Sequence, residues 1–560
     1  MLQSTLFGLL HERSKKLYTL LIIILSYTIG SAQSTDLSII DQLDDQIMQY
    51  IDDSSPGVAV GVIKEGETIY ENYFGYANLE HQVKIDKQTR FNIASNAKQF
   101  TALCVLRLIE EGLLDLEDDI RKYLPDLYQA YPNKISVSNL IAHTSGIRDV
   151  YELWSLQGKT WWKLFIGNKE AIDLLRRQKD LNFKPSSDFL YSNSNYILLT
   201  EIISKVTGKS FEEYSGTLFK DLGLTETSYL TNYMEVIPHK ARPYSNWNGW
   251  REYPSITETH GDGGLYTTLS DQLKWEKIIQ LREGNNFSTP IINRSQSSIA
   301  SSGTQFYGFG LLFDSYKGLD YSYHNGSTGA YNATFLRFID DNTTIVVMTN
   351  NGNIPTNHLA KQLADIILET DEDDPPIFPA DPEKVEEVSN LINLLGSYQH
   401  EDETIINISE NNGSIYREIY QRDPIQLIQE KGGLFHYESN EDLKINFSNI
   451  GSQNQDLTIY LSSQQPYRYI KVENRNIDKD ELNGIFYNEE TDTEIIINYD
   501  SNNKFKIIKN GRERDGILIK KDLLRMMNSY KIRITRDKDL NITGLLVDNN
   551  RIKNVVFTKQ

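Results

Sequence analysis

Residues 91–112 read FNIASNAKQFTALCVLRLIEEG and place Ser95 three positions before Lys98. The segment after Lys98 is apolar on nearly every side, which predicts a buried helix from about residue 96 to 111. Gly112 is a natural stop for that helix. Because positions i and i+3 share one face of a helix, Ser95 and Lys98 should point the same way.

This serine and lysine suggest nucleophilic catalysis. Burial penalises the charged form of a lysine, and a neutral amine is a usable general base for a neighbouring hydroxyl. A helix N-terminus also stabilises developing negative charge. The alternative is an ordinary exposed lysine in a first helical turn, because a lone S-x-x-K pattern is common. The pair by itself therefore leaves both interpretations open.

A second candidate segment is Tyr191-Ser192-Asn193, which precedes another apolar run. A tyrosine beside a lysine can shuttle protons, and an asparagine can donate a hydrogen bond to a substrate carbonyl. The structural alternative is a surface loop. The pattern Y-x-N therefore needs support from other parts of the chain.

A third candidate segment, residues 323–327, reads YHNGS and should lie on a strand. Gly326 would allow a substrate backbone to approach closely. The Ser327 main-chain N–H could then pair with the Ser95 N–H as an oxyanion hole. His324, Gly326 and Ser327 are accordingly candidate substrate-binding residues.

The flanking segments predict an α+β domain over residues 36–370. Residues 57–75 and 332–350 read as β-hairpins, with helical patterns between them and an amphipathic helix after the second. An antiparallel sheet flanked by helices would thus be built from the two ends of the domain. Residues 371–387 are acidic and proline-rich, as in a semi-rigid linker.

Residues 388–560 show short alternating apolar runs separated by turn residues, which predicts an all-β, barrel-like domain. A weak internal echo relates residues 395–398 (LGSY) to 483–486 (NGIF), which suggests a meander. No catalytic constellation is evident in this region. We expect a structural or binding module.

The bulk properties limit the partners and the compartment. The 560 residues carry a net charge of -20, which disfavours contact with nucleic acid phosphates. Residues 1–32 combine a basic start, a short apolar run and small residues at 30–32, as in a secretion signal. We expect an exported chain, periplasmic or extracellular, with no stable membrane span after cleavage. The alternative is a membrane anchor, for which the apolar run is short.

The three motifs in this order resemble the serine β-lactamase and penicillin-binding-protein superfamily, in its branch of class C β-lactamases, DD-peptidases and esterases. The resemblance spans about residues 40–370. It includes LEDDIRKYLPDL (116–127), LIAHTSGIRDV (140–150), VTGKSFEEY (206–214) and GGLYTTLSDQLKW (263–275). The C-terminal region more weakly resembles the lipocalin-like β domain appended to some members.

The resemblance implies a role for each matched position. Ser95 would be the acylating nucleophile and Lys98 would take its proton. Tyr191 would protonate the leaving group and help to activate water, while Asn193 would orient the substrate amide. The implied function is an exported serine hydrolase acting on an amide or ester, plausibly a D-amino-acid-containing peptide.

His324 departs from the family pattern, because β-lactamases usually carry lysine there, in K-T-G. A histidine is mostly neutral at pH 7, so a substrate carboxylate would lose a fixed positive partner. This suits a peptidase, amidase or esterase at least as well as a β-lactamase. The alternatives that remain are a β-lactamase proper and a catalytically silent penicillin-binding sensor or scaffold.

The remaining expectations concern cofactors and partners. The sequence contains neither H-E-x-x-H nor a Cys/His cluster, so no metal and no cofactor are expected. The expected partner is a small-molecule or peptide substrate, and not nucleic acid. The sequence leaves the oligomeric state open.

Overall fold

The computed structural model describes most of the chain from residue 38 onward. The described ranges are 38–282, 288–302, 305–368, 386, 388, 390–401, 405–418, 424–438, 440–452, 454–460, 466–472, 479–501, 504–526 and 530–560. The signal segment predicted for 1–32 and nearly all of the linker predicted for 371–387 lie outside these ranges. Within them, no helix combines the length and apolar character needed to cross a bilayer.

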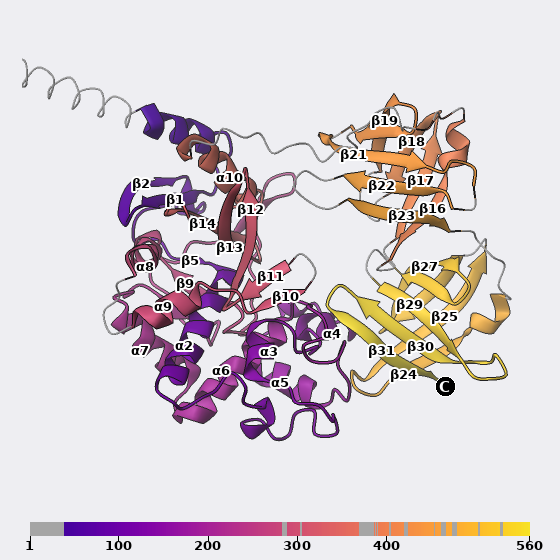
Figure 1. Ribbon diagram of the computed structural model, residues 1–560, viewed down its shortest axis with the longest axis horizontal. Coiled ribbons are helices and arrows are strands. Elements are labelled where there is room, and N and C mark those ends of the chain that lie inside the picture. Colours follow the sequence, from indigo (N-terminus) through magenta and orange to yellow (C-terminus); the bar gives the residue numbers. More distant parts are fainter. Residues whose placement is uncertain are drawn as a thin grey trace, which may run out of the picture.

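An antiparallel eight-stranded sheet organises the N-terminal domain, in the order β10-β11-β12-β13-β14-β15-β1-β2 (Figure 1). Both predicted hairpins are confirmed and lie side by side, because β1 pairs with β15 from Val58↔Thr349 to Lys64↔Thr343. The strands are β1 (Val58–Lys64), β2 (Glu67–Phe74), β10 (Ala300–Ser302), β11 (Gln305–Gly308), β12 (Leu311–Tyr316), β13 (Leu319–Thr328), β14 (Tyr331–Phe338) and β15 (Thr343–Thr349).

Helices cover both faces of this sheet because its central strands are apolar on both sides. On one face, Val58, Val60 and Val62 pack against α10 (Thr356–Ile367) and the helical residues 38–48. On the other face, Ala59 and Ile63 join the core around α2 (Lys98–Glu110) and α8 (Leu269–Leu281). The result is the three-layer α+β arrangement that the sequence predicts.

The remaining helices of this domain gather around α2, below the sheet in Figure 1. They are α3 (Val137–Ile141), α4 (Val150–Leu156), α5 (Asn168–Arg176), α6 (Asn193–Thr207), α7 (Phe211–Asp221) and α9 (Thr289–Ser295). Small sheets join them, formed by β3 (Tyr76–Asn78), β4 (Val83–Lys84), β5 (Phe91–Asn92), β6 (Ser228–Tyr229), β7 (Tyr244–Asn246), β8 (Trp250–Glu252) and β9 (Leu265–Thr267).

The all-β prediction for the C-terminal region is confirmed, but the region forms two closed eight-stranded barrels rather than one. The first contains β16 (Gly396–His400), β17 (Ile405–Asn411), β18 (Ser414–Glu418), β19 (Ile425–Lys431), β20 (Leu434–Tyr437), β21 (Asn440–Ser448), β22 (Asp456–Tyr460) and β23 (Tyr467–Val472). The second contains β24 (Gly484–Asn488), β25 (Thr493–Ser501), β26 (Lys504–Lys509), β27 (Arg512–Lys520), β28 (Leu523–Met526), β29 (Tyr530–Arg536), β30 (Ile542–Asn549) and β31 (Ile552–Lys559).

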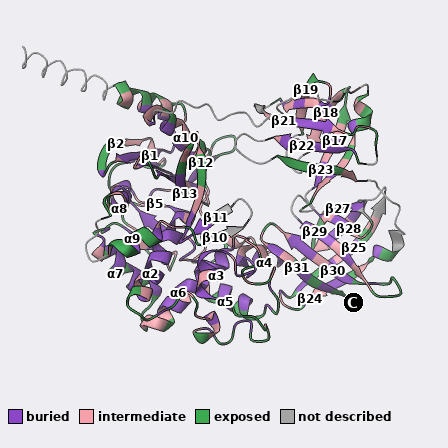
Figure 2. Cartoon of the chain, in the orientation of Figure 1, coloured by how far each residue is buried: buried purple, intermediate pink, exposed green. Residues whose placement is uncertain are grey.

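The two barrels relate differently to the N-terminal domain. Apolar residues of the second barrel, from Leu482 to Phe557, belong to the same continuous hydrophobic core as α2 and α4. The first barrel has a separate core around Tyr398 and Phe447. Figures 1 and 2 show the second barrel beside α4, with buried residues on both sides of the contact. The second barrel is therefore positioned to influence sites near α4.

Candidate active site

Ser95 lies on a 3-10 turn, η1 (Ala94–Ala97), between β5 and the start of α2. The residue before it, Ala94, has φ +47°, a left-handed conformation that costs a non-glycine residue about 1–2 kcal/mol. The Ala94 N–H donates to Asn92 Oδ1 at 2.9 Å, which helps to hold this conformation. Such local strain recurs at functional sites, and here it presents the Ser95 hydroxyl to a cavity.

Lys98 is completely buried at the first turn of α2, which excludes the alternative of an exposed lysine. Its Nζ lies 3.1 Å from Ser95 Oγ, 2.9 Å from Asn193 Oδ1 and 2.5 Å from the main-chain oxygen of Asp262. Neither of the last two oxygens can donate a hydrogen, whereas a serine hydroxyl can. The two acceptors therefore fix the Lys98 amine beside Ser95 Oγ, within reach of the serine proton.

Asn193 is held in one orientation by Asp149, a completely buried residue. Asp149 Oδ2 accepts hydrogen bonds from the Asn193 main-chain N–H at 2.7 Å and from Asn193 Nδ2 at 2.9 Å. The other carboxylate oxygen caps α4, accepting from the N–H groups of Tyr151 and Glu152. This arrangement directs Asn193 Oδ1 toward Lys98.

Tyr191 stands beside the lysine, with its ring centroid 4.9 Å from Lys98 Nζ. Its ring packs against the imidazole of His143 at 4.3 Å between centroids. The Tyr191 hydroxyl is buried and has no hydrogen-bond partner within the described structure. An unsatisfied buried hydroxyl on a ring beside Lys98, in the wall of the cavity that Ser95 also lines, is available for proton transfer with a bound substrate.

His324 lies on β13 and is neutral across the physiological range, because burial and the nearby Lys98 lower its pKa to about 3. Its Nδ1 lies 2.8 Å from the main-chain oxygen of Asn325, and its Nε2 lies 3.4 Å from the Tyr307 hydroxyl. The lowered pKa agrees with the mostly neutral side chain expected at this position, and the substrate-binding role of His324 stays a prediction.

Gly326 allows β13 to pack against the turn that carries Ser95. A Cβ atom at this position would come within 2.2 Å of the main-chain oxygen of Ile93. The space freed by this glycine is occupied by protein backbone, whereas the sequence suggested an approaching substrate. Its neighbour Ser327 does line the cavity, and a substrate-binding role for Gly326 itself stays a prediction.

These residues surround a cavity of about 400 Å³. Five of the residues singled out from the sequence line it: Ser95, Tyr191, Asn193, His324 and Ser327. Lys98 lies beneath them. The lining also includes residues to which the sequence gave no site role, among them Tyr151, Glu152 and Arg551. Trp161 also lies on the cavity wall, with its ring centroid 4.3 Å from that of Tyr151.

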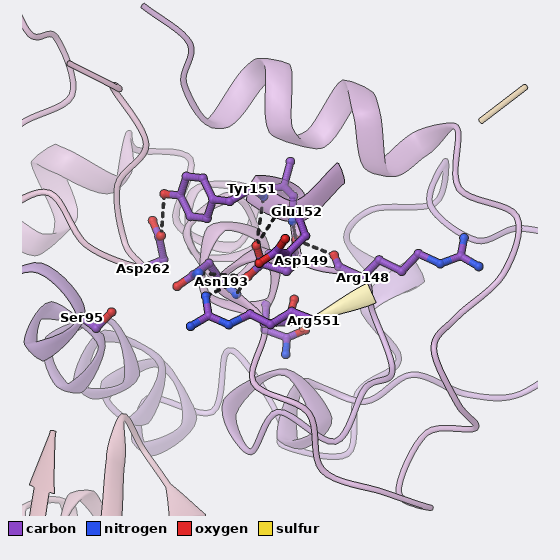
Figure 3. A network of polar contacts seen from close by, with 12 residues as sticks. Ser95, Arg148, Asp149, Tyr151, Glu152, Asn193, Asp262 and Arg551 are labelled. Carbon is purple, nitrogen blue, oxygen red and sulfur yellow. Dashed lines mark hydrogen bonds and ion pairs between the residues drawn. The ribbon is translucent and has the colours of Figure 1, made fainter. Parts of the chain in front are cut away.

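Arg551 reaches this cavity from the second barrel, 456 positions after Ser95 in the sequence. It sits in the two-residue turn between β30 and β31, whose flanking pair is Asn549↔Ile552. Figure 3 shows its side chain extending toward Ser95. Its guanidinium carbon lies 4.8 Å from the Tyr191 ring centroid, and a terminal nitrogen lies 3.7 Å from Asp149 Oδ2. A domain without its own catalytic constellation therefore forms part of the wall.

Glu152 is another titratable residue on this cavity wall, and it lies at the contact with the second barrel. Burial, with a smaller contribution from the charge on Asp149, raises its pKa from 4.5 to about 7. Its Oε2 accepts a hydrogen bond from Asn549 Nδ2 of the second barrel at 2.6 Å. The carboxyl group therefore changes charge near neutral pH at the contact between the two domains.

We expect replacement of Glu152 by glutamine to stabilise the protein at pH 8.5 but not at pH 5. Between pH 4.5 and 7 the folded state holds a proton on Glu152 that the unfolded state releases, so the free energy of unfolding falls as pH rises. The full effect, reached above pH 7, is on the order of 3 kcal/mol.

Thermal unfolding midpoints of wild type and Glu152→Gln at both pH values measure this effect. Glu201→Gln is the matched control, since its carboxylate lies beside Lys205 on the surface of α6. An equal shift of the midpoint at both pH values would contradict a titrating, buried Glu152.

The described residues contain no group of three or more His, Cys, Asp or Glu side chains arranged to hold a metal ion. The arrangement instead places a hydroxyl, an amine and a phenol around one cavity. This set suits acyl transfer through a serine nucleophile.

Comparison with known proteins gives a family match and several relatives. A family model described as Beta-lactamase matches residues 40–368. A D-aminopeptidase of Gluconobacter oxydans is 29% identical over 300 residues, which cover 53% of this chain and 56% of the relative. Penicillin-binding protein 4* of Bacillus subtilis is 28% identical over 375 residues, covering 63% of this chain and 82% of the relative.

A likeness among solved structures extends further along the chain. The structure of an octameric penicillin-binding protein homologue from Pyrococcus abyssi matches with a TM-score of 0.55 and 24% identity. The match covers 79% of this chain and all of that chain. At this identity the likeness concerns the fold. The chain spans only about half the length of the D-aminopeptidase that it matches.

Proposed function

Since the chain belongs to the Beta-lactamase family, whose model matches residues 40–368, we propose that this serine hydrolase is exported and cleaves an amide or ester bond through an acyl-enzyme at Ser95. The observation that carries the proposal is the position of Lys98 Nζ, 3.1 Å from Ser95 Oγ and held by two oxygens that only accept hydrogen bonds. The catalytic residues would be Ser95, Lys98 and Tyr191.

In the acylation step, Ser95 Oγ attacks the substrate carbonyl carbon while its proton passes to Lys98 Nζ. The N–H groups of Ser95 and Ser327 would stabilise the oxyanion that forms. As the bond from carbon to the leaving nitrogen or oxygen breaks, the Tyr191 hydroxyl gives its proton to the leaving group. The buried and unpartnered state of that hydroxyl supports this role.

In the deacylation step, a water molecule attacks the ester carbon of the acyl-enzyme. Tyr191 takes a proton from this water, the bond between carbon and Ser95 Oγ breaks, and Lys98 returns a proton to the serine. Asn193, fixed by Asp149, would orient the amide of the bound substrate. Each proton that leaves a residue in the first step is restored in the second.

The proposed substrate is a peptide or amide that contains a D-amino acid. The name of the Gluconobacter oxydans relative supports this class. A neutral His324 suits a peptidase, amidase or esterase at least as well as a β-lactamase, because His324 itself offers no positive charge to a substrate carboxylate. Export is supported by the signal-like composition of residues 1–32. We therefore place the enzyme in the periplasm or outside the cell.

Intact-mass spectrometry after incubation with a fluorophosphonate and, separately, with a labelled penicillin tests the proposal. We expect the fluorophosphonate to add one adduct to the wild-type chain and none to Ser95→Ala. Ser270→Ala is a matched control, because Ser270 is a partly exposed hydroxyl at the start of α8, outside the cavity wall. An adduct that persists in Ser95→Ala would refute the assignment of the nucleophile.

The penicillin reaction separates the alternatives. A persistent adduct at Ser95 would favour penicillin-binding or DD-peptidase chemistry, and fast release of the adduct would indicate a β-lactamase. Labelling by the fluorophosphonate alone would favour an esterase or amidase. A chain that reacts with neither reagent would be a silent sensor or scaffold.

A further inference from the structure

We propose that Arg551, supplied by the second barrel, is the anion-recognition residue of this active site and binds a carboxylate of the substrate. The proposal rests on the proposed function only in placing the substrate in the Ser95 cavity. Arg551 lines that cavity together with Ser95, Tyr191 and Asn193. Its side chain extends toward Ser95 from the turn between β30 and β31 (Figure 3).

The main chain of Arg551 is fixed to the N-terminal domain. Its carbonyl oxygen accepts hydrogen bonds from the Asp149 N–H at 3.3 Å and from Asn182 Nδ2 at 3.2 Å. Asn182 Oδ1 also accepts a hydrogen bond from the Lys553 N–H at 2.7 Å. The Asn182 side chain therefore bonds the main chain both in the turn and in β31. The position of the turn therefore does not depend on the arginine side chain.

A buried ion pair strengthens this docking. Arg148, whose side chain is only 1% exposed, pairs with Glu490 of the second barrel at 2.8 Å. The same guanidinium donates to the main-chain oxygen of Asn554 at 3.2 Å, just beyond the Arg551 turn. Replacing Glu490 with an uncharged residue would leave the buried Arg148 charge without its partner, which is strongly unfavourable. Arg551 is thus presented to the cavity by a well-anchored element.

The guanidinium itself retains its hydrogen-bonding capacity. Across the described ranges, it donates no hydrogen bond to a protein oxygen, and its nearest carboxylate, Asp149, lies 3.7 Å away. That distance exceeds the 2.7–2.9 Å typical of a charge-assisted hydrogen bond. Asp149 already accepts four hydrogen bonds from Asn193, Tyr151 and Glu152. The planar set of donors is therefore free to bind a carboxylate in bidentate fashion.

The charges around Arg551 favour an anionic ligand. His324 is neutral, so it offers no positive charge of its own. Two carboxyl groups line this wall: burial raises the pKa of Glu152 to about 7, and burial also raises the pKa of Asp262. Tyr191 supports the guanidinium through its ring face. Arg551 therefore provides, from another domain, the fixed positive charge that position 324 lacks.

The substrate carboxylate could lie on the acyl side or on the leaving-group side of the scissile bond, and two ligand pairs distinguish these positions. The first pair is N-acetyl-D-alanyl-D-alanine and its C-terminal amide. The second pair is N-succinyl-D-phenylalanine anilide and the analogue in which the succinyl carboxylate is a carboxamide. Each pair differs only in one negative charge.

Isothermal titration calorimetry with Ser95→Ala measures binding without turnover. For one of the two pairs, we expect the carboxylate ligand to bind at least tenfold more tightly than its amide. Adding Arg551→Gln should reduce the ratio of the two dissociation constants, amide over carboxylate, to less than twofold. Arg551→Lys should leave an intermediate ratio, because lysine keeps the positive charge but lacks the planar guanidinium. The pair that responds identifies the side of the scissile bond.

Lys553→Gln is the matched control, since it removes the same charge from the same hairpin. The Lys553 amine faces Asp188 at 3.6 Å and is not part of the cavity wall. The ratio should remain unchanged in this variant. The proposal is overturned if neither pair discriminates, if discrimination survives Arg551→Gln, or if Lys553→Gln abolishes it equally.

Failure of the proposed function gives a different result. Turnover that persisted in Ser95→Ala would refute the acyl-enzyme at Ser95, whereas the binding ratio would still report on Arg551. Circular dichroism and the thermal midpoint of each variant verify folding. The intermediate ratio expected for Arg551→Lys would separate lost charge from lost structure.

Discussion

Replacing Ser95 with alanine is expected to lower kcat by at least about 10⁴-fold on any amide or ester that the wild-type enzyme cleaves. The reason is that the substitution removes the atom that forms the covalent intermediate. The fold should be nearly unaffected, because Ser95 accepts one hydrogen bond from Lys98, which keeps two other acceptors. Loss of such a contact at a partly exposed hydroxyl costs about 1 kcal/mol.

Steady-state kinetics together with a thermal melt measure both halves of this expectation. The Ser270→Ala enzyme should keep its turnover and its unfolding midpoint. A Ser95→Ala enzyme with wild-type kcat would show that another residue attacks the substrate. Loss of turnover accompanied by a large fall in the midpoint would point to misfolding instead of lost chemistry.

Replacing Lys98 with methionine is the second substitution with a large expected effect. Methionine fills a similar volume but cannot accept the Ser95 proton, so acylation should slow by about 10²- to 10⁴-fold. Unlike Ser95→Ala, this variant should also lose stability. Asn193 Oδ1 and the Asp262 carbonyl oxygen would each lose a buried donor, at a cost of about 1–3 kcal/mol per group.

The rate of fluorophosphonate labelling, followed by intact mass at low temperature where the variant remains folded, isolates the chemical effect. Lys205→Met is a matched control, because Lys205 lies at the exposed end of α6 beside Glu201. Labelling of Lys98→Met at the wild-type rate would mean that another group removes the serine proton.

The N-terminal domain was predictable because its signals are local. The hairpins at 57–75 and 332–350 carry both alternating or apolar strands and turn residues, and the structure forms β1–β2 and β14–β15 there. The segment after Lys98 is buried as its composition requires. Gly112 follows the helix with φ +71°, as expected for a stop.

In the C-terminal region, the alternation of apolar and polar residues predicts strands, but it does not predict how many barrels those strands close into. Every strand of a small barrel alternates in the same way, so sixteen strands in two barrels look like one longer run. The similarity between LGSY (395–398) and NGIF (483–486) was the sequence signal that could have indicated two barrels. It marks β16 and β24, the first strand of each barrel, with Tyr398 and Phe486 completely buried at matching positions.

The candidate site likewise contains residues whose contacts follow from local sequence and one residue whose position does not. Ser95 and Lys98 are neighbours on one helical turn, so their contact follows from spacing. Arg551 was missed because N-N-R in a hairpin turn is an ordinary surface pattern. Its position in the cavity depends on docking between domains, through contacts such as those of Asn182 and Arg148, which no local pattern encodes.

The distance in sequence between Ser95 and Arg551 has a consequence for how the enzyme matures. During synthesis, the nucleophile and its lysine emerge early, whereas the turn that completes the cavity wall emerges after both barrels have been made. A chain that ended before residue 551 would carry Ser95 and Lys98 but would lack this part of the cavity wall. The complete wall therefore exists only in a chain that has been made almost to its last residue.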